Sequence, residues 1–228
     1  MMKDFYERFD TRKPVLVFGL NTLSELAAYV LSHDSPFRVI GHTVDVAYCS
    51  TEQKNGLPVF AFETLEQNFE SDEVNLLIPI GYTDINGLRK ARYEQAKARG
   101  YACVSYISSC AAVWPSLVVG DNSLIYENTV IQPYATVGNN CVVRSNVHIS
   151  HHAQVADHCF ISAGVVTGGN VSLGERCFIG LGSIVRDNTK LATKSFIGAG
   201  SLVVKDTEEN GLYVGSPARL QNKPADEV

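Results

Sequence analysis

Apolar residues recur at every sixth position from residue 107 to about residue 207. Sixteen of the seventeen first positions between Ile107 and Val203 are aliphatic, and the exception is Thr167. The fifth position of each unit, from Ala111 to Thr207, is small or medium-sized and never charged. A helix repeats near 3.6 residues and a strand at 2, so neither element explains the pattern. A sustained repeat of six predicts a parallel β-helix with the first positions inside.

A second period of 18 residues lies over the first one. Cys141, Cys159 and Cys177 are 18 residues apart, as are the small corner residues at positions 120, 138, 156, 174 and 192. Three flat faces of six residues make one coil, so we expect these residues to stack in ladders about 4.8 Å apart. Seventeen units comprise 17 × 6 = 102 residues, a little under six coils.

The pattern before residue 107 alternates between strands and helices. We expect strands at residues 14–19, 37–45, 57–60 and 74–81, and helices from Asn21 onward and over 63–69 and 85–99. This order predicts a small parallel sheet, so residues 1–106 form an α/β domain before the β-helix of residues 107–207. Glycine and proline break the repeat after residue 207. In the remaining segment, 208–228, we expect the last eight residues to be a frayed polar tail.

Composition narrows the range of functions. The net charge is −5 and no basic run occurs, which disfavours binding to nucleic acid. No apolar stretch approaches the roughly 20 residues that span a bilayer, and the amino terminus lacks the apolar core of a signal peptide. We therefore expect a cytoplasmic protein without a membrane partner. The six cysteines include no Cys-x-x-Cys pair, and we expect the thiols to be reduced.

Four of the six histidines lie between residues 148 and 158. The repeat places His151 and His152 third and fourth in the unit that starts at Ile149, at a corner that faces solvent or a neighbouring chain. His158 holds the fourth place of the next unit, on a different edge. These histidines therefore cannot all converge within one subunit.

Two segments resemble a known family. Ile149-Ser150-His151-His152 is similar to the segment around the catalytic histidine of hexapeptide-repeat sugar acyltransferases of the sialic-acid O-acetyltransferase and bacillosamine N-acetyltransferase type. Residues 214–219, Val-Gly-Ser-Pro-Ala-Arg, resemble the ending of that family. The resemblance implies a left-handed β-helix, a Rossmann-like domain for a nucleotide sugar, and a homotrimer with sites at its subunit interfaces. It also implies acetyl-CoA as co-substrate and no metal ion.

The resemblance also implies roles for individual residues. His151 would be the general base of a direct acetyl transfer to an amino group of a nucleotide-activated sugar, in the synthesis of a surface glycan such as lipopolysaccharide. His152 stands where relatives often carry an acid. The positions implied for acetyl-CoA are Phe160, Gly180, Leu181, Gly198, Ala199 and Gly215.

Ligands of parallel sheets bind outside the carboxyl ends of the strands. The substrate-binding candidates there are Gly19, Asn21, Thr22, Asp45, Gly81 and Tyr82. Gly19 is not followed by the further glycines of a dinucleotide fingerprint, and a plain turn between strand and helix explains it equally well.

Three other functions fit parts of the pattern. Sugar O-acetylation would use the same base. A metal-dependent hydrolase resembling the γ-class carbonic anhydrases would use the histidines as ligands, although His151 and His152 have no histidine partner 36 residues away. A non-catalytic trimeric scaffold would leave His151 as a solvated corner residue.

Overall fold

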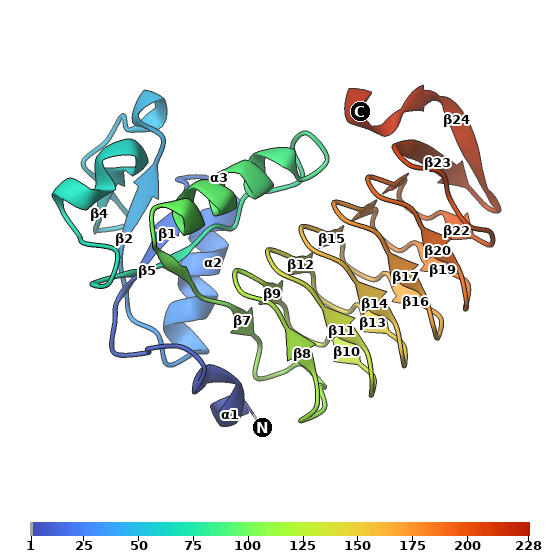
Figure 1. The fold of residues 1–228 in the computed structure, drawn as a ribbon, viewed down its shortest axis with the longest axis horizontal. Coiled ribbons are helices and arrows are strands. Elements are labelled where there is room, and N and C mark those ends of the chain that lie inside the picture. Colours follow the sequence, from blue (N-terminus) through green and yellow to red (C-terminus); the bar gives the residue numbers. More distant parts are fainter. Residues whose placement is uncertain (1) are drawn as a thin grey trace.

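The computed structural model describes residues 2–228 as an α/β part followed by a long β-helix (Figure 1). The α/β part contains a six-stranded sheet in the order β3-β4-β2-β1-β5-β6. The strands are β1 (Val15–Phe18), β2 (Val39–Val44), β3 (Gln53–Lys54), β4 (Leu57–Ala61), β5 (Asn75–Leu77) and β6 (Ala102–Cys103). All neighbours are parallel except β3 and β4.

Helices cover both faces of this sheet. On one face, α2 (Thr22–His33) packs Ala27 and Leu31 against Val15 and Val17 of β1. On the other face lie α3 (Gly87–Ala98) and the 3-10 helix η2 (Phe62–Gln67). Helix α2 starts after Asn21 because the Asn21 side chain accepts hydrogen bonds from two backbone amides of its first turn.

The β-helix is built from two-residue strands in three parallel sheets. Paired residues are 18 apart, as in Ile131↔Ile149 and Ile149↔Thr167, so one coil contains 18 residues. The first positions of the six-residue units are buried from Val119 to Val203 and form a continuous core with the small fifth positions. The predicted fold class, a small parallel α/β sheet followed by a left-handed β-helix, is confirmed.

The prism has three faces that differ in their outward residues. The first face, here the docked face, is covered by the α/β part and consists of β7 (Tyr106–Ile107), β9 (Leu124–Ile125), β12 (Val142–Val143), β15 (Phe160–Ile161), β18 (Phe178–Ile179) and β21 (Phe196–Ile197). The second, the aliphatic face, consists of β10 (Val130–Ile131), β13 (His148–Ile149), β16 (Val166–Thr167), β19 (Ile184–Val185) and β22 (Leu202–Val203). The third, the polar face, consists of β8 (Val118–Val119), β11 (Thr136–Val137), β14 (Gln154–Val155), β17 (Ser172–Leu173) and β20 (Lys190–Leu191).

Arg89 of α3 joins the α/β part to the prism. Its side chain is fully buried and donates to the carbonyls of Ile80 and Gly81 at the end of the α/β sheet, at 3.1 and 2.8 Å. It also donates to the carbonyls of Asn140, His158 and Cys159 on the β-helix, at 3.1, 2.8 and 3.1 Å. Burial lowers the pKa of Arg89 to about 10, so the guanidinium remains charged at neutral pH. One side chain therefore holds five carbonyls from both parts of the molecule.

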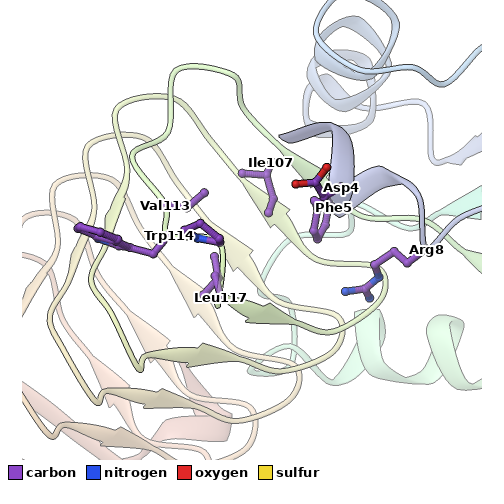
Figure 2. A pocket seen from close by; sticks show the side chains of 8 residues that line it. Asp4, Phe5, Arg8, Ile107, Val113, Trp114 and Leu117 are labelled. Atoms are coloured by element: carbon purple, nitrogen blue, oxygen red, sulfur yellow. The ribbon is translucent and has the colours of Figure 1, made fainter. Parts of the chain in front are cut away.

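Both ends of the prism are covered by elements that do not belong to the repeat. At the amino-terminal end, the short helix α1 (Met2–Tyr6) places Phe5 against the first coil near Ile107, with Val113 and Leu117 around it (Figure 2). The Tyr6 hydroxyl donates to the carbonyl of Ile107 at 3.1 Å. At the other end, β23 (Gly211–Gly215) extends the docked face and pairs with β24 (Ala218–Pro224).

Three sequence predictions about elements were wrong. The tail is not frayed, because most of it forms the antiparallel strand β24 and the 3-10 helix η3 (Ala225–Glu227), in which Ala225 is fully buried. Helix α3 begins at Gly87 and not at residue 85, because Asp84, Ile85 and Asn86 have positive φ values of 52°, 42° and 64°. Contacts to the β-helix hold that turn, since the Asn86 amide donates to two carbonyls there, at 3.1 Å each.

The third error concerns the expected strand at residues 74–81, which is limited to Asn75–Leu77. Beyond it, Ile78 exchanges backbone hydrogen bonds with the side chain of Asn122 in the β-helix, at 2.8 and 3.2 Å. No helix in the described part of the chain is long and apolar enough to cross a membrane.

Candidate functional site

His151 lies on the edge between the aliphatic and the polar face, which we call the histidine edge (residues 132–135, 150–153, 168–171 and 186–189). Its side chain is exposed, and its backbone N–H donates to the Gln132 side chain one coil below at 2.9 Å. The ring lies directly against Gly169, one coil above. A Cβ on Gly169 would come within 2.4 Å of Cε1 and 2.7 Å of Nε2 of the ring. The glycine therefore provides the space that the imidazole occupies.

His152 interacts with the His151 ring. The two Nδ1 atoms are 3.2 Å apart, a distance at which one nitrogen donates its proton and the other accepts. The His152 ring in turn packs on Tyr134, with centroids 4.7 Å apart. When His151 is the donor, its Nε2 lone pair is free, which is the form that can accept a proton from a substrate. His151 Nε2 makes no hydrogen bond to the residues that the structure describes.

The other two histidines of the cluster lie elsewhere, as the repeat predicts. His148 faces outward on the aliphatic face. His158 is buried on the edge between the polar and the docked face, where its Nδ1 accepts from the Asn140 amide at 2.7 Å. Burial lowers the pKa of His158, so the ring is neutral there, whereas the nearby Glu175 and Asp157 carboxylates oppose this shift. In the described part of the chain, no three histidine, cysteine or acidic side chains lie close enough to hold a metal ion.

A largely apolar groove of about 470 Å³ runs along the edge between the docked and the aliphatic face, here called the groove edge (residues 126–129, 144–147, 162–165, 180–183 and 198–201). Four of the residues expected to bind acetyl-CoA line it, namely Phe160, Gly180, Leu181 and Ala199. Gly198 and Gly215 do not line the groove. Gly198 packs against Val214, and Gly215, with a φ of 103°, is the last residue of β23.

The substrate candidates divide between two cavities. Gly19, Asn21 and Asp45 line a pocket of about 430 Å³ at the carboxyl ends of the sheet strands, together with Tyr48 and Ile80. Both Asp45 carboxylate oxygens accept hydrogen bonds from the Arg92 guanidinium, each at 2.7 Å. Asp45 thus lines the pocket with its carboxylate already engaged in an ion pair.

The remaining substrate candidates lie between this pocket and the groove or inside the groove. Thr22 is the exposed first residue of α2. Gly81 lies beside Leu23, whose Cδ1 would be 3.3 Å from a Cβ at position 81. Tyr82 lines the groove, with its ring 4.3 Å from that of Phe178 and 5.5 Å from that of Phe160. The first turn of α2 therefore separates the α/β pocket from the groove.

Sequence reasoning missed six lining residues of the groove: Leu23, Arg144, Ser162, Ala163, Phe178 and Phe196. The signal for five of these was present in the 18-residue spacing, which relates Phe178 and Phe196 to Phe160, Arg144 and Ser162 to Gly180, and Ala163 to Leu181. The identity of the face that they occupy was not deducible, since it depends on where the α/β part docks.

Comparisons with known proteins agree with this architecture. Residues 116–151 and 134–169 match the model of the bacterial transferase hexapeptide (six repeats). A search of curated proteins finds no significant match.

Several solved structures have the same fold at low sequence identity. The acetyltransferase domain of PglB from Neisseria gonorrhoeae FA1090 superposes with a TM-score of 0.81 at 22% identity, covering 92% of this chain and 100% of that one. A mutant of perosamine N-acetyltransferase from Caulobacter crescentus, in complex with CoA and GDP-perosamine, gives 0.82 at 22% identity, with 92% and 97% coverage. WeeI from Acinetobacter baumannii AYE gives 0.79 at 17% identity, with 92% and 100% coverage. The chain thus carries the bacterial transferase hexapeptide repeat and has the two-part fold of these proteins along nearly its whole length.

Proposed function

We propose that the protein transfers the acetyl group of acetyl-CoA to an amino group of a nucleotide-activated sugar. Proteins with the same fold support this proposal, because one is solved with acetyl-CoA and another with CoA and GDP-perosamine. The cytoplasm supplies both acetyl-CoA and nucleotide sugars, and we place the protein there, in the synthesis of a surface glycan such as lipopolysaccharide.

The observation that carries the proposal is the arrangement of two edges around one uncovered apolar face. The histidine edge and the groove edge flank the aliphatic face. Outward residues of that face include Val130, Val166, Ile184 and Leu202, of which Val166 and Ile184 are 41% and 48% exposed. This stripe is apolar except for His148, and an uncovered apolar stripe favours contact with another copy of the chain.

We further propose a homotrimer in which this face is covered. Three prisms around a common axis would each present the histidine edge to the groove edge of a neighbour. His151 of one subunit would then face the groove of the next at the same height along the prism. Within one chain, the full width of the aliphatic face separates His151 from Leu181, so the site is complete only in the assembly.

The chemistry follows from a neutral imidazole next to a thioester. The amine nitrogen of the sugar attacks the acetyl carbonyl, so a C–N bond forms and the C–S bond to CoA breaks. His151 Nε2 takes the proton that the nitrogen loses and passes it to the departing thiolate. His152 orients the ring through Nδ1, in the place where a carboxylate would also compensate the imidazolium charge.

Two alternatives remain distinct proposals. An O-acetyltransferase would use the same base on a hydroxyl group, and the position of the acetyl group in the product separates the two. A hydrolase resembling the γ-class carbonic anhydrases would require a bound metal, which metal analysis of the purified protein would detect.

The test of the enzyme assignment is His151→Asn, assayed by chromatographic detection of free CoA with a panel of UDP-, dTDP- and GDP-amino sugars. We expect loss of at least about two orders of magnitude in kcat, as is typical for removal of a general base, with CoA binding and trimer mass unchanged. His33→Asn is the matched control, since His33 is exposed on α2 and stacks on Tyr29. Retention of full turnover in His151→Asn would refute the base assignment. Absence of CoA binding by the wild-type protein in calorimetry would favour a non-catalytic scaffold.

A further inference from the structure

Two polar side chains face the otherwise apolar groove. Arg144 and Ser162 are 18 residues apart and therefore occupy the same position on successive coils of the groove edge. Both line the groove, and its other lining residues are uncharged. They stand about one strand spacing, roughly 4.8 Å, apart along the prism.

Arg144 has no ion-pair partner among the residues that the structure describes. Its Nη1 is a buried atom without a hydrogen-bond partner among the described residues. Its guanidinium lies over the ring of Tyr126, with Cζ 4.4 Å from the ring centroid. The neighbouring acid Glu127 is directed elsewhere, as its carboxylate accepts from the Ser145 hydroxyl at 2.6 Å. A buried guanidinium nitrogen without a hydrogen-bond acceptor destabilises the folded protein. Its presence in the groove therefore favours a bound ligand that supplies the acceptor.

Ser162 offers a second hydrogen-bonding group beside Arg144. The residue is only 6% exposed, and its hydroxyl forms no hydrogen bond with the part of the chain that the structure describes. A hydroxyl one coil above a guanidinium can donate to the same oxygen-bearing group that the guanidinium binds. The aromatic wall of Phe160 and Phe178 next to the pair excludes water and strengthens such charge-assisted bonds.

We propose that Arg144 and Ser162 form an anion subsite that binds a carboxylate or phosphate group of the acceptor. The assignment rests on the proposed function for the identity of the acceptor. The subsite implies that the acceptor carries its negative charge within reach of the groove edge. This charge comes either from the diphosphate of the nucleotide sugar or from a carboxylate on the sugar ring, as in a uronic acid.

Position along the prism argues against the phosphates of CoA as the ligand. Arg144 and His151 are seven residues apart on one coil, whereas Leu181 and Ala199 lie two and three coils above Arg144. A thioester at the height of His151, with its pantetheine arm along Leu181 and Ala199, places the phosphates of CoA farther toward the carboxyl-terminal coils. Arg144 is therefore on the acceptor side of the reacting carbonyl.

The presence of the subsite can be tested without knowledge of the nucleotide. Crystals of the wild-type protein soaked in sodium bromide should show an anomalous peak between the Arg144 guanidinium and the Ser162 hydroxyl. Crystals of Arg144→Gln, treated in the same way, should lack this peak. Absence of the peak in the wild-type crystals would overturn the proposal, whatever the outcome of the activity assay.

The source of the charge can be identified by titration with two series of ligands: UDP, UDP-glucose and UDP-glucuronate, and GDP, GDP-mannose and GDP-mannuronate. If Arg144 binds a sugar carboxylate, Arg144→Gln should weaken only the uronates, by about tenfold or more. If it binds the diphosphate, all members of the bound series should weaken equally. Arg144→Lys should recover part of the affinity, because lysine keeps the charge but not the fork of donors.

Two further measurements keep the result specific. The control variant is Arg38→Gln, which removes the same charge from an exposed position just before β2. This position lies at the opposite end of the sheet strands from the α/β pocket, so the variant should bind every ligand as the wild type does. CoA affinity should be unchanged in Arg144→Gln. If the wild type and Arg144→Gln bind every nucleotide sugar with equal affinity, the subsite proposal is refuted. If the wild type does not bind CoA at all, the transferase proposal is refuted instead.

Discussion

Replacement of Arg89 tests how the two parts of the molecule are held together. The change Arg89→Met keeps much of the aliphatic length and removes all five hydrogen bonds to carbonyl oxygens. The carbonyl of Cys159 retains a second donor, the backbone N–H of Val142 at 2.9 Å. The other four carbonyls, those of Ile80, Gly81, Asn140 and His158, have no second donor within the described chain.

A buried polar group without a partner costs about 1–3 kcal/mol. The bonds to Asn140 and His158 are buried and those to Ile80 and Gly81 are partly buried. The two buried carbonyls alone place the expected loss at about 2 kcal/mol or more, a substantial part of the roughly 5–15 kcal/mol by which most domains are stable. Arg89→Lys should fall between the wild type and Arg89→Met, because an ammonium group has three donors and cannot reach five acceptors.

The measurement is equilibrium unfolding in urea, followed by both far-UV circular dichroism and tyrosine fluorescence. The matched control is Lys90→Met, one residue further along α3, which removes a half-exposed surface ion pair to Glu175 of the β-helix. Exposed pairs contribute at most about 1 kcal/mol, so this variant should remain close to the wild type. If Arg89→Met were no less stable than Lys90→Met, the proposed role of the buried guanidinium would be wrong.

Three other changes test particular contacts. Gly169→Ala should lower kcat strongly, because the new methyl group displaces the His151 ring. The melting temperature should change little, because φ at Gly169 is not positive and alanine adds no backbone strain. An unchanged kcat would show that the ring does not need this space. His158→Asn should reduce the loss of stability on acidification. Burial lowers the pKa of His158 in the folded protein, so below about pH 6.5 the unfolded chain binds a proton that the folded protein does not bind. The contribution of the neutral ring to wild-type stability is therefore complete above that pH and is lost as the pH falls toward the folded-state pKa. Urea titrations at pH 7 and pH 5 would measure the difference, and equal acid sensitivity of the two proteins would contradict it. Ile184→Glu, on the uncovered aliphatic face, should convert a trimer into monomers in light-scattering measurements and abolish turnover; a trimer of unchanged mass would exclude that face as the interface.

The hexapeptide region was predictable because its contacts are themselves periodic. A residue of the β-helix pairs with the residue 18 positions later, so each repeat specifies its own neighbours. The strands, the buried first positions and the outward placement of His151 all follow from this rule. The aromatic ladder of Phe160, Phe178 and Phe196 was equally visible in the spacing.

The α/β part was predictable as a class and less so in its details. Alternating strands and helices indicate a parallel sheet, but contacts to the prism shorten β5 and delay the start of α3. Asn86 and Asn122 make these contacts, and their partners lie 90 and 44 residues away in the chain. Local propensity carries no information about partners at such separations.

The sequence by itself determined that the chain coils with a period of 18, buries its aliphatic positions and leaves a histidine pair on one edge. Only the tertiary structure decided which face the α/β part covers, that Arg89 joins five carbonyls, and that the tail forms a hairpin on the last coil. The physical reason is that the docking of two preformed surfaces depends on the shape and hydrogen-bonding groups of both, whereas a solenoid repeats one short-range set of contacts.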